Sequence, residues 1–476
     1  MIRWAHAGDL GAFACFAVGV LGVVAGLVVT LAVPRTLDGA AVAAAPAEAT
    51  EDPYPDVVPL ATTPTPRWTV SMSDIDVPAD TQDAKSRRPA VLAANTSIVV
   101  GGPREVTETA LMAFDAKTGK KKWPKVSDFR AEECVFSRDG RLACIRRGAD
   151  RATSEIGFID AGSGQVTGTR TIAGGENPTG PALVSAGKGF LVTTKQFVHK
   201  DAHYALTLTW FSSDGSRTWE HKPPPGFDDP ALSEAGNVVA VRDFGRRVQV
   251  YALDSGDLVY DSTEDLKNTP SRISSPLVEV APVRTGFAVS IRGDAKTVTV
   301  YDSKGTRRGV IEGVVLAFMP QGSEGDLIPV EGTDDDHQRT LGVASTVTFE
   351  VVAATPSRDS VIREQILGER FLVGLRSGRD EDWLDFDTQS PTRTRSIAAG
   401  PTVLLAFDGT RGFFADRAGS NSGVPYLFAC DLASGRQVWE IGNAGGEERE
   451  HEFVGPYLMH TRSGDAGQAT ISRLGA

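Results

Sequence analysis

The sequence predicts an all-β domain made of repeated units, and three observations carry this prediction. Short runs of alternating or β-branched hydrophobic residues, separated by turns rich in Gly, Asp and Ser, extend from about residue 67 to the end of the 476-residue chain. A hydrophobic strand, a small turn ending in Gly and an aromatic residue four positions later recur together with a period of about 45 residues. No run of about 12 residues in this region has helical periodicity. Four short strands with their turns need this length, so each unit is expected to be one blade of a β-propeller.

Two copies of the repeat are especially clear: Leu111 to Trp123 (LMAFDAKTGKKKW) and Leu427 to Trp439 (LFACDLASGRQVW). The turn glycines that set its frame are Gly119, Gly164, Gly215, Gly256, Gly305 and Gly435. The residues four positions after a turn glycine are Trp123, Trp219, Tyr260 and Trp439, with Gly168 and Gly309 in the other two copies. We expect the large rings to wedge between neighbouring sheets, where a propeller has its core.

The last unit of this frame is one strand short. Three strands are expected near 451–454, 457–461 and 470–474, and the turn glycine that should precede a fourth is Gly475, at the end of the chain. Residues 67–72 form a strand-like run outside any unit, with Trp68 near its start. We therefore predict that this N-terminal strand completes the last sheet, with Trp68 as a further packing aromatic. Such a closure removes a free sheet edge.

The number of blades follows less directly from the repeat. Counting every unit gives nine, but the stretch 312–355 has no turn glycine followed by an aromatic residue. Propellers typically have four to eight blades. The sequence therefore favours eight four-stranded blades, with part of 312–360 as an insertion or linker, and seven and nine as alternatives.

The N-terminal region has a different composition. Leu10 to Val33 is a run of 24 residues without a charge. At about 1.5 Å per residue, it would span roughly 36 Å as a helix, enough to cross a bilayer. Arg3 precedes this run and several acidic residues follow it, so residues 1–9 are expected in the cytoplasm and the propeller outside. The length of the run favours an uncleaved signal-anchor helix at 10–33, with cleavage in the Ala-rich stretch 40–47 as the alternative.

The region between this helix and the propeller, residues 34–66, contains seven Pro together with many Ala and Thr. Such a composition favours an extended linker, because it cannot bury a core. The net charge of the chain is −12 and no basic cluster occurs in it. A nucleic-acid partner is therefore not expected, because phosphate binding requires concentrated Lys and Arg.

A disulfide between Cys134 and Cys144 is predicted from the spacing of the two residues. The segment 133–144 contains two strands around Arg138-Asp-Gly140, and Gly suits the left-handed position of a three-residue hairpin loop. If Ser137 pairs with Arg141, the two cysteines lie directly opposite, about 4.5 Å apart at Cα in a non-hydrogen-bonded pair. An exported location permits oxidation. Two reduced, packed cysteines are the alternative, and Cys430 is expected to be a buried small hydrophobic residue.

The segment 110–123 resembles the repeat of the pyrroloquinoline-quinone-like β-propellers, and the resemblance spans about 67–476. This superfamily includes the quinoprotein alcohol dehydrogenases and a bacterial outer-membrane assembly lipoprotein that has no cofactor. The resemblance implies an eight-bladed propeller and a non-catalytic, membrane-associated scaffold. The enzymes of the superfamily have an adjacent Cys-Cys pair beside the quinone, a Trp platform, and Glu, Asn and Asp that hold calcium. No Cys-Cys pair occurs here, so no cofactor is expected.

Other polar clusters have simpler interpretations. His199 and His203 lie in a polar loop without a third ligand at metal-site spacing, and the acidic runs 334–337 and 379–382 lack the spacing of a calcium loop. We find no Gly-x-Ser-x-Gly elbow, phosphate loop or His-Glu-x-x-His motif. No catalytic residue or metal ligand is therefore nominated. Trp210 and Trp383 lie outside the aromatic position of the repeat, and strand placement favours the core for both.

These observations lead to a functional hypothesis. The protein is predicted to be a single-pass cell-membrane protein, anchored through residues 10–33, whose extracytoplasmic propeller 67–476 is a scaffold that binds or assembles another envelope protein. Two alternatives stay open at this stage. One is a propeller enzyme, quinone-dependent or other, and the second is a module that binds an envelope glycan.

Overall fold

A computed structural model gives the fold of the chain. Its two compact units are Met1–Glu48 and Ala49–Ala476, and the residues described all belong to the second. The described ranges are 57–71, 89–103, 109–124, 127–147, 153–173, 181–198, 203–243, 247–268, 277–292, 296–317, 325–333, 338–356, 360–367, 370–377, 380–387, 394–399, 402–416, 427–442, 449–462 and 469–476. The predicted membrane helix 10–33 and the short segment 1–9 lie outside these ranges. Within the described ranges no helix has the length and apolar character needed to span a bilayer.

The described strands form nine antiparallel sheets of four strands each, which we number as blades in chain order. Blade 1 is β2 (Pro89–Ala94), β3 (Ser97–Pro103), β4 (Thr109–Asp115) and β5 (Ser127–Ala131), and blade 2 is β6 (Glu133–Phe136), β7 (Leu142–Arg147), β8 (Thr153–Ile159) and β9 (Val166–Ala173). Blade 3 is β10 (Ala182–Ala186), β11 (Gly189–Val198), β12 (His203–Ser212) and β13 (Arg217–His221). Blade 4 is β14 (Asp228–Ser233), β15 (Val238–Asp243), β16 (Arg247–Ala252) and β17 (Leu258–Asp261), followed by helix α2 (Thr263–Asn268).

The second half of the ring repeats this order. Blade 5 is β18 (Leu277–Val283), β19 (Gly286–Arg292), β20 (Thr297–Tyr301) and β21 (Arg307–Glu312), and blade 6 is β22 (Val314–Leu316), β23 (Leu327–Thr333), β24 (Arg339–Ser345) and β25 (Val351–Pro356). Blade 7 is β26 (Ser360–Leu367), β27 (Arg370–Ser377), β28 (Asp380–Asp387) and β29 (Thr394–Ala399). Blade 8 is β30 (Thr402–Phe407), β31 (Arg411–Asp416), β32 (Leu427–Asp431) and β33 (Arg436–Ile441), and blade 9 is β34 (Arg449–Val454), β35 (Tyr457–Arg462), β36 (Thr470–Gly475) and β1 (Thr65–Ser71).

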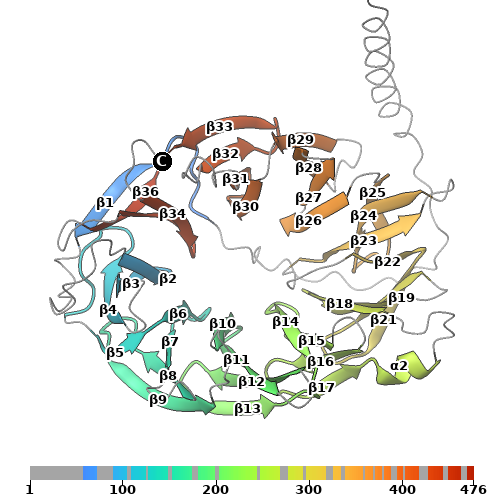
Figure 1. The fold of residues 1–476 in the computed structure, drawn as a ribbon, viewed down its shortest axis with the longest axis horizontal. Helices are drawn as coiled ribbons and strands as arrows, with labels where there is room; N and C mark the ends of the chain where they lie inside the picture. The colour runs from blue at the N-terminus through green and yellow to red at the C-terminus, as the bar shows by residue number, and fades with distance from the viewer. Residues whose placement is uncertain are drawn as a thin grey trace, which may run out of the picture. The chain divides into compact units, whose positions relative to one another are not determined.

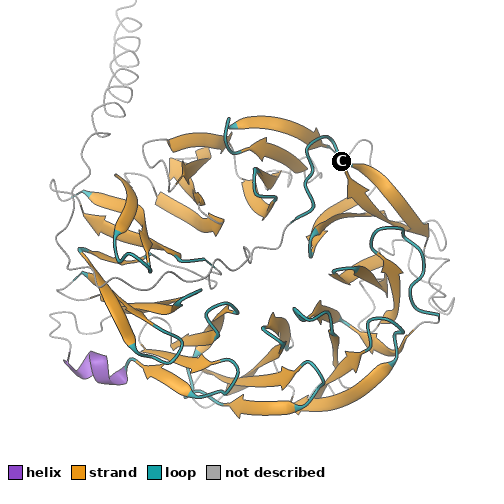
Figure 2. Cartoon of the chain, turned by 180° about the vertical axis from the view of Figure 1, so that it is seen from behind, coloured by secondary structure: helices purple, strands orange, loops and turns teal. Residues whose placement is uncertain are grey.

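The blades follow one another around a ring, with the first strand of each blade nearest the centre and the last strand at the rim (Figure 1). The reverse view shows helix α2, in purple, at the outer edge of the ring (Figure 2). Buried hydrophobic clusters join neighbouring blades around most of this ring. Blades 6 and 7 are in contact through β23 and β26. Blades joined in this way leave the rim strands and the inner strands as the exposed edges of the sheets.

Blade 9 contains the strand that its own unit lacks. β1, from the N-terminal side of the propeller, lies antiparallel to β36, with Trp68 opposite Arg473 and Val70 opposite Ile471. The strand begins at Thr65 and ends at Ser71, a shift of one or two residues from the predicted bounds 67–72. Because the first and last segments of the propeller share one sheet, the ring is closed by backbone hydrogen bonds.

The prediction of eight blades is wrong, because residues 314–356 form a complete sheet. Its outer turn has Phe349 at the position that Gly occupies in other blades: the Phe349 N–H donates to Ser345 O at 3.0 Å, as the Gly119 N–H donates to Asp115 O at 2.9 Å. Phe349 adopts a left-handed φ of 60°, which residues other than Gly rarely adopt. The missing glycine concealed this blade in the sequence, and the nine-bladed alternative is correct.

Part of the expected linker packs against the ring. Val57 and Leu60 are buried in the cluster that joins blades 8 and 9. The Val58 N–H donates to Pro456 O at 2.9 Å, and the Leu60 N–H donates to Asp408 Oδ2 at 3.3 Å. We call residues 57–60 the N-terminal latch. The latch was not expected from composition, because its hydrophobic residues are few and lie among prolines. Residues 34–56 of the expected linker lie outside the described ranges.

Candidate functional site

The repeat aromatics lie where one blade meets the turn of the next. The indole Nε1–H donates to Ala116 O from Trp68, to Ala161 O from Trp123 and to Leu253 O from Trp219, at 3.0, 3.0 and 2.7 Å. In each case the acceptor lies three residues before a turn glycine, and a Cβ on that glycine would come within 2.6 Å of the same indole. The glycine is thus required both for its left-handed φ and to leave room for the neighbouring ring.

Trp439 makes the same type of contact in a different way. Blade 9 has no hairpin turn at this position, and the Trp439 Nε1–H donates to Leu60 O of the N-terminal latch at 2.7 Å. Tyr260 lies against Phe287 and Tyr301 of blade 5, with ring centroids 5.6 and 5.1 Å away. Burial and the hydrogen bond that its hydroxyl donates to Asp265 raise the pKa of Tyr260. These five aromatic residues therefore lie at blade junctions, where their rings already pack against neighbouring blades.

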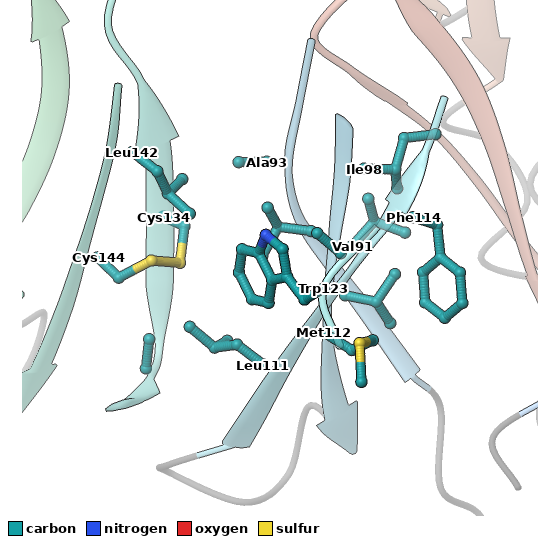
Figure 3. Close-up of a cluster of buried hydrophobic side chains, with 14 of the residues drawn as sticks. Val91, Ala93, Ile98, Leu111, Met112, Phe114, Trp123, Cys134, Leu142 and Cys144 are labelled. Atoms are coloured by element: carbon teal, nitrogen blue, oxygen red, sulfur yellow. A yellow bond between two sulfur atoms is a disulfide. The ribbon is translucent and has the colours of Figure 1, made fainter. Parts of the chain in front are cut away.

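The predicted disulfide is present. Cys134 on β6 pairs directly with Cys144 on β7, with a Cα–Cα distance of 4.0 Å. Figure 3 shows the bond beside Trp123 and Leu111, in the cluster that joins blades 1 and 2. Cys430 is buried, and burial raises the pKa of its thiol to about 11. The bridge covalently links the first two strands of blade 2, and both of its cysteines are buried.

The other side chains singled out in the sequence form no common site within the described ranges. Trp210 is buried in blade 3 and its Nε1–H donates to Ala186 O at 3.3 Å. Trp383 lies on β28 opposite Gly374 and Ala398, and His203 begins β12. His199 and the acidic runs 334–337 and 379–382 lie wholly or partly outside the described ranges. In the part of the chain that the structure describes, no three His, Cys, Asp or Glu side chains are grouped as metal ligands.

The strongest candidate for function is the surface formed by the innermost strands, which we call the inner-strand surface. These nine strands are β2, β6, β10, β14, β18, β22, β26, β30 and β34. Each is the edge of its sheet and pairs only with the second strand of its own blade, so no described ladder joins it to another blade. These edges border the centre of the ring (Figure 1), and on β22 the N–H and C=O of Leu316 already bond to Ser290 Oγ and Arg292 of blade 5. An unpaired edge presents backbone N–H and C=O groups that another extended chain can bind.

Aliphatic side chains on these strands are exposed to solvent. Val184 on β10 and Leu405 on β30 are each 40% exposed, and Leu277 at the start of β18 is 37% exposed. Three further strands carry half-buried aliphatic residues: Leu92, Val135 and Val315. The inner strands therefore carry aliphatic side chains that are at least partly exposed.

β-Bulges in the inner strands contribute to this surface. The ladder between β30 and β31 passes from Leu404 to Ala406 and leaves Leu405 without a partner residue. The ladder between β2 and β3 passes Leu92 in the same way, and that between β26 and β27 passes Ile362. A bulge changes the direction of the side chain at the extra residue. At Leu405 the bulge interrupts the alternation of buried and exposed side chains along β30, and the Leu405 side chain is exposed.

Two acidic residues of the inner strands, Glu133 and Glu279, have pKa values that their surroundings raise. Glu133 on β6 is exposed, yet surrounding protein atoms and the neighbouring Glu132 carboxylate raise the pKa of its carboxyl. A carboxylate in this situation gains from a cation placed beside it.

Glu279 on β18 has such a cation from the neighbouring blade. Arg242 Nη1 lies 3.4 Å from Glu279 Oε2, and both side chains are nearly buried. Burial raises the pKa of Glu279, while Arg242 and then Arg292 lower it in part. Arg292 continues the polar contacts into blade 6 through a hydrogen bond to Leu316 O at 3.2 Å. This ion pair fixes blade 4 against blade 5, and no signal in the sequence identified it, because its partners are 37 residues apart.

The fold and this surface define a class: a closed β-propeller of nine blades in which the N-terminal strand completes the last blade. The model of the conjugation-associated 9-bladed β-propeller domain family matches residues 42–470. The chain therefore belongs to this family. The match supports the propeller predicted from the sequence, but nine blades replace the eight that the pyrroloquinoline-quinone-like resemblance implies.

Solved structures with similar folds share little sequence with this chain. The computationally designed Ika8 protein matches with a TM-score of 0.40 and 10% identity, over 82% of this chain and 97% of that protein. The β-propeller domain of the Trilobed protease from Pyrococcus furiosus gives a TM-score of 0.38 and 12% identity, over 75% and 98% of the two chains. BamB from Moraxella catarrhalis gives 0.33 and 11%, over 78% and 100%. No curated protein matches the chain in sequence.

Proposed function

We propose that this protein is a membrane-anchored, extracytoplasmic scaffold that binds another envelope protein of a bacterial conjugation apparatus. The observation that carries the proposal is the inner-strand surface of a ring closed through its own N-terminal strand, with exposed aliphatic side chains at Val184 and Leu405. Exposed apolar groups reduce the solubility of a protein unless they are covered by a partner. A surface of this kind therefore favours a binding role. The family description supplies the association with conjugation.

The sequence supports the anchoring part of the proposal. The uncharged run of 24 residues from Leu10 to Val33 is long enough to span a bilayer, and its flanking charges favour a cytoplasmic N-terminus. The latch and β1 would then follow the linker on the path of the chain from the anchor to the closing blade. In this arrangement the propeller is held at the outer side of the membrane, where a binding surface can meet other envelope proteins.

A non-catalytic role is part of this proposal. The repeat aromatics, which could have formed a stacking platform, are hydrogen-bonded to the turns of neighbouring blades. Trp210, which lies outside the aromatic position of the repeat, is buried. The scaffold function accounts for the inner-strand surface without requiring reactive groups.

A transfer assay in the native host tests the proposal. An in-frame deletion should reduce the frequency of conjugative transfer by at least tenfold, and the full chain should restore it. A chain without residues 10–33 should fail to restore transfer although it folds, because the propeller is no longer held at the membrane. Protease added outside intact spheroplasts should degrade the propeller. Unchanged transfer in the deletion strain, or a protected propeller, would contradict the proposal.

A further inference from the structure

The stretch that joins the N-terminal latch to strand β1 exposes three threonines. Thr62 and Thr63 lie just after the latch, and Thr65 is the first residue of β1. All three are exposed to solvent, whereas Leu60 before them and Pro64 among them are buried. Because the buried residues hold this stretch against the ring, the threonines lie at defined positions on its surface.

The fold does not use the hydroxyl groups of these threonines. Thr69, which is also exposed and lies further along the same strand, shares a hydrogen bond with Ser472 Oγ at 2.8 Å. The hydroxyls of Thr62, Thr63 and Thr65 have no hydrogen-bond partner among the residues that the structure describes. A group attached to any of the three would therefore displace no described hydrogen bond.

The sequence around these threonines is typical of a substrate for O-glycosylation. Residues 62–66 are Thr-Thr-Pro-Thr-Pro, and segments in which Thr and Pro are concentrated are those that carry O-linked sugars. Proline fixes its own φ and biases the preceding residue towards extended backbone. A transferase can therefore bind this stretch as an extended peptide before the propeller closes around it.

The compartment favours a sugar over a phosphate as the attached group. The disulfide between Cys134 and Cys144 fits an oxidising compartment, and the proposed function places the propeller outside the cytoplasm. ATP and nucleotide sugars are cytoplasmic, so a kinase would lack its donor there. A sugar carried across the membrane on a polyprenyl phosphate is available on the outer side.

We propose that Thr62, Thr63 and Thr65 are acceptors for O-linked hexoses transferred from a polyprenyl-phosphate-linked sugar. In this step the threonine oxygen forms a bond to C1 of the sugar, and the bond between C1 and the phosphate oxygen breaks. Polyprenyl phosphate leaves and takes up the hydroxyl proton. A sugar is bulky and must stay on the surface, which these exposed positions allow. The inference goes beyond the scaffold role and shares with it only the extracytoplasmic location of the propeller.

Mass spectrometry of the full chain from the native host tests the proposal. The tryptic peptide that ends at Arg67 contains all three threonines, and it should be heavier than its sequence by a whole number of hexose units. Electron-transfer fragmentation should place these units on Thr62, Thr63 or Thr65. An unmodified peptide, a phosphate in place of hexose, or sugar confined to other residues of the peptide would overturn the inference.

Variants without the hydroxyls provide the matched comparison. The triple change Thr62→Val, Thr63→Val and Thr65→Val keeps the side-chain shape, so the chain should fold and its peptide should carry no hexose. Thr169→Val, at an exposed threonine of rim strand β9, should leave the hexose units in place. Hexose retained on this peptide in the triple variant would refute the assignment of the sites.

Limited proteolysis shows what the sugars do. Ala61 is exposed beside the first acceptor, and exposed connections of this kind are preferred sites of proteolytic cleavage. Elastase cleaves after small residues, and it should cut the native-host chain at Ala61 about fivefold more slowly than the triple variant, because a bulky sugar hinders access.

The failure of this inference is distinguishable from the failure of the proposed function. An unmodified peptide in a chain whose propeller is degraded by protease outside spheroplasts would refute the sugar and leave the scaffold function intact. A propeller protected from that protease would remove both.

Discussion

The Trp439 Nε1–H donates a hydrogen bond to the backbone oxygen of Leu60 at 2.7 Å, across 379 residues of sequence. In earlier blades the equivalent indole meets a hairpin turn of the next blade, as Trp123 meets Ala161. The closing blade has no such turn, because its outer strand comes from the other end of the propeller. The N-terminal latch supplies the missing acceptor, so closure uses two segments, the latch and strand β1.

Loss of the Trp439–Leu60 contact should open this closure. Trp439→Phe removes the donor and leaves a buried carbonyl without it, which should lower the free energy of unfolding by about 1–3 kcal/mol. Leu60→Ala should lower it by about 2–5 kcal/mol, because Leu60 is fully buried. The effects should be less than additive in the double variant, because the residues share one contact. Guanidinium unfolding measures the change, and Val438→Ala at an exposed neighbouring residue is the control. Additive losses in the double variant would show that Trp439 and Leu60 do not stabilise the protein through a shared contact.

Much of this fold could be predicted from the sequence, since the repeat encodes contacts between neighbours. The turn Gly119 must lack a side chain because Trp68 occupies that space, and Trp123 in turn occupies the space beside Gly164. Blade 6 escaped detection because it uses the inverse arrangement: the ring of Phe349 lies over Gly309, where a Cβ would be 2.6 Å away. The contact is preserved although its two residue types have changed places, and a search for one pattern cannot detect the other.

This exchange predicts the outcome of swapping the two residues. Phe349→Gly relieves the left-handed strain but removes a half-buried ring, and it should lower the free energy of unfolding by about 1–2 kcal/mol. Gly309→Trp alone should be at least as destabilising, because the indole collides with Phe349. In the double variant, Gly309→Trp with Phe349→Gly, the arrangement of the other blades is restored and at least half of the loss should be recovered. Denaturation midpoints of the four proteins measure this coupling, and a double variant worse than either single change would contradict it.

The inner-strand surface could not be predicted, for a different physical reason. Val184 and Leu405 have the sequence context of ordinary buried strand residues. Their exposure follows from the position of each strand at the inner edge of its sheet and, for Leu405, from a bulge. Likewise, the ion pair of Arg242 and Glu279 depends on how blade 4 meets blade 5. Such features depend on the placement of whole sheets, which local patterns do not specify.

The disulfide should stabilise blade 2 through a short closed loop. Cys134 and Cys144 are 10 residues apart, and in the chain-entropy model a loop of this size contributes about 2–3 kcal/mol. Replacing both residues by Ala should lower the free energy of unfolding by about this amount, as measured by guanidinium denaturation without reductant. Cys430→Ala is the control for loss of a buried sulfur. Alkylation of Cys134 and Cys144 in denatured, unreduced protein from the native host would show that the bond does not form there.

Turn aspartates should give the protein an acid-sensitive component of stability. The hydroxyl and backbone N–H of Thr118 hold the pKa of Asp115 below its usual value, and those of Ser163 do the same for Asp160. Their folded pKa values lie below the unfolded ones, so this stability is present above about pH 4 and is lost as pH falls through the folded pKa values. The variant Asp115→Asn with Asp160→Asn should be less stable than the wild type at pH 7, and the difference should shrink as pH falls through the folded pKa values. Thermal midpoints between pH 2 and 7 measure this, with the exposed Asp257→Asn as control; a constant difference would refute the mechanism.

The ion pair between Arg242 and Glu279 should show the opposite dependence on pH. Burial raises the folded pKa of Glu279, so the native state binds more protons than the unfolded state, and stability falls as pH rises from the unfolded pKa through the folded one. Arg242→Met removes the opposing positive charge, raises this pKa further and should destabilise the protein at pH 7 by about 3–5 kcal/mol. The loss should shrink as pH falls, because a protonated Glu279 needs no cation. It should also shrink when Glu279→Gln is added, since the uncompensated buried charge is then absent. A loss in Arg242→Met that neither acid nor Glu279→Gln reduces would mean that Arg242 stabilises the blade junction through packing rather than charge.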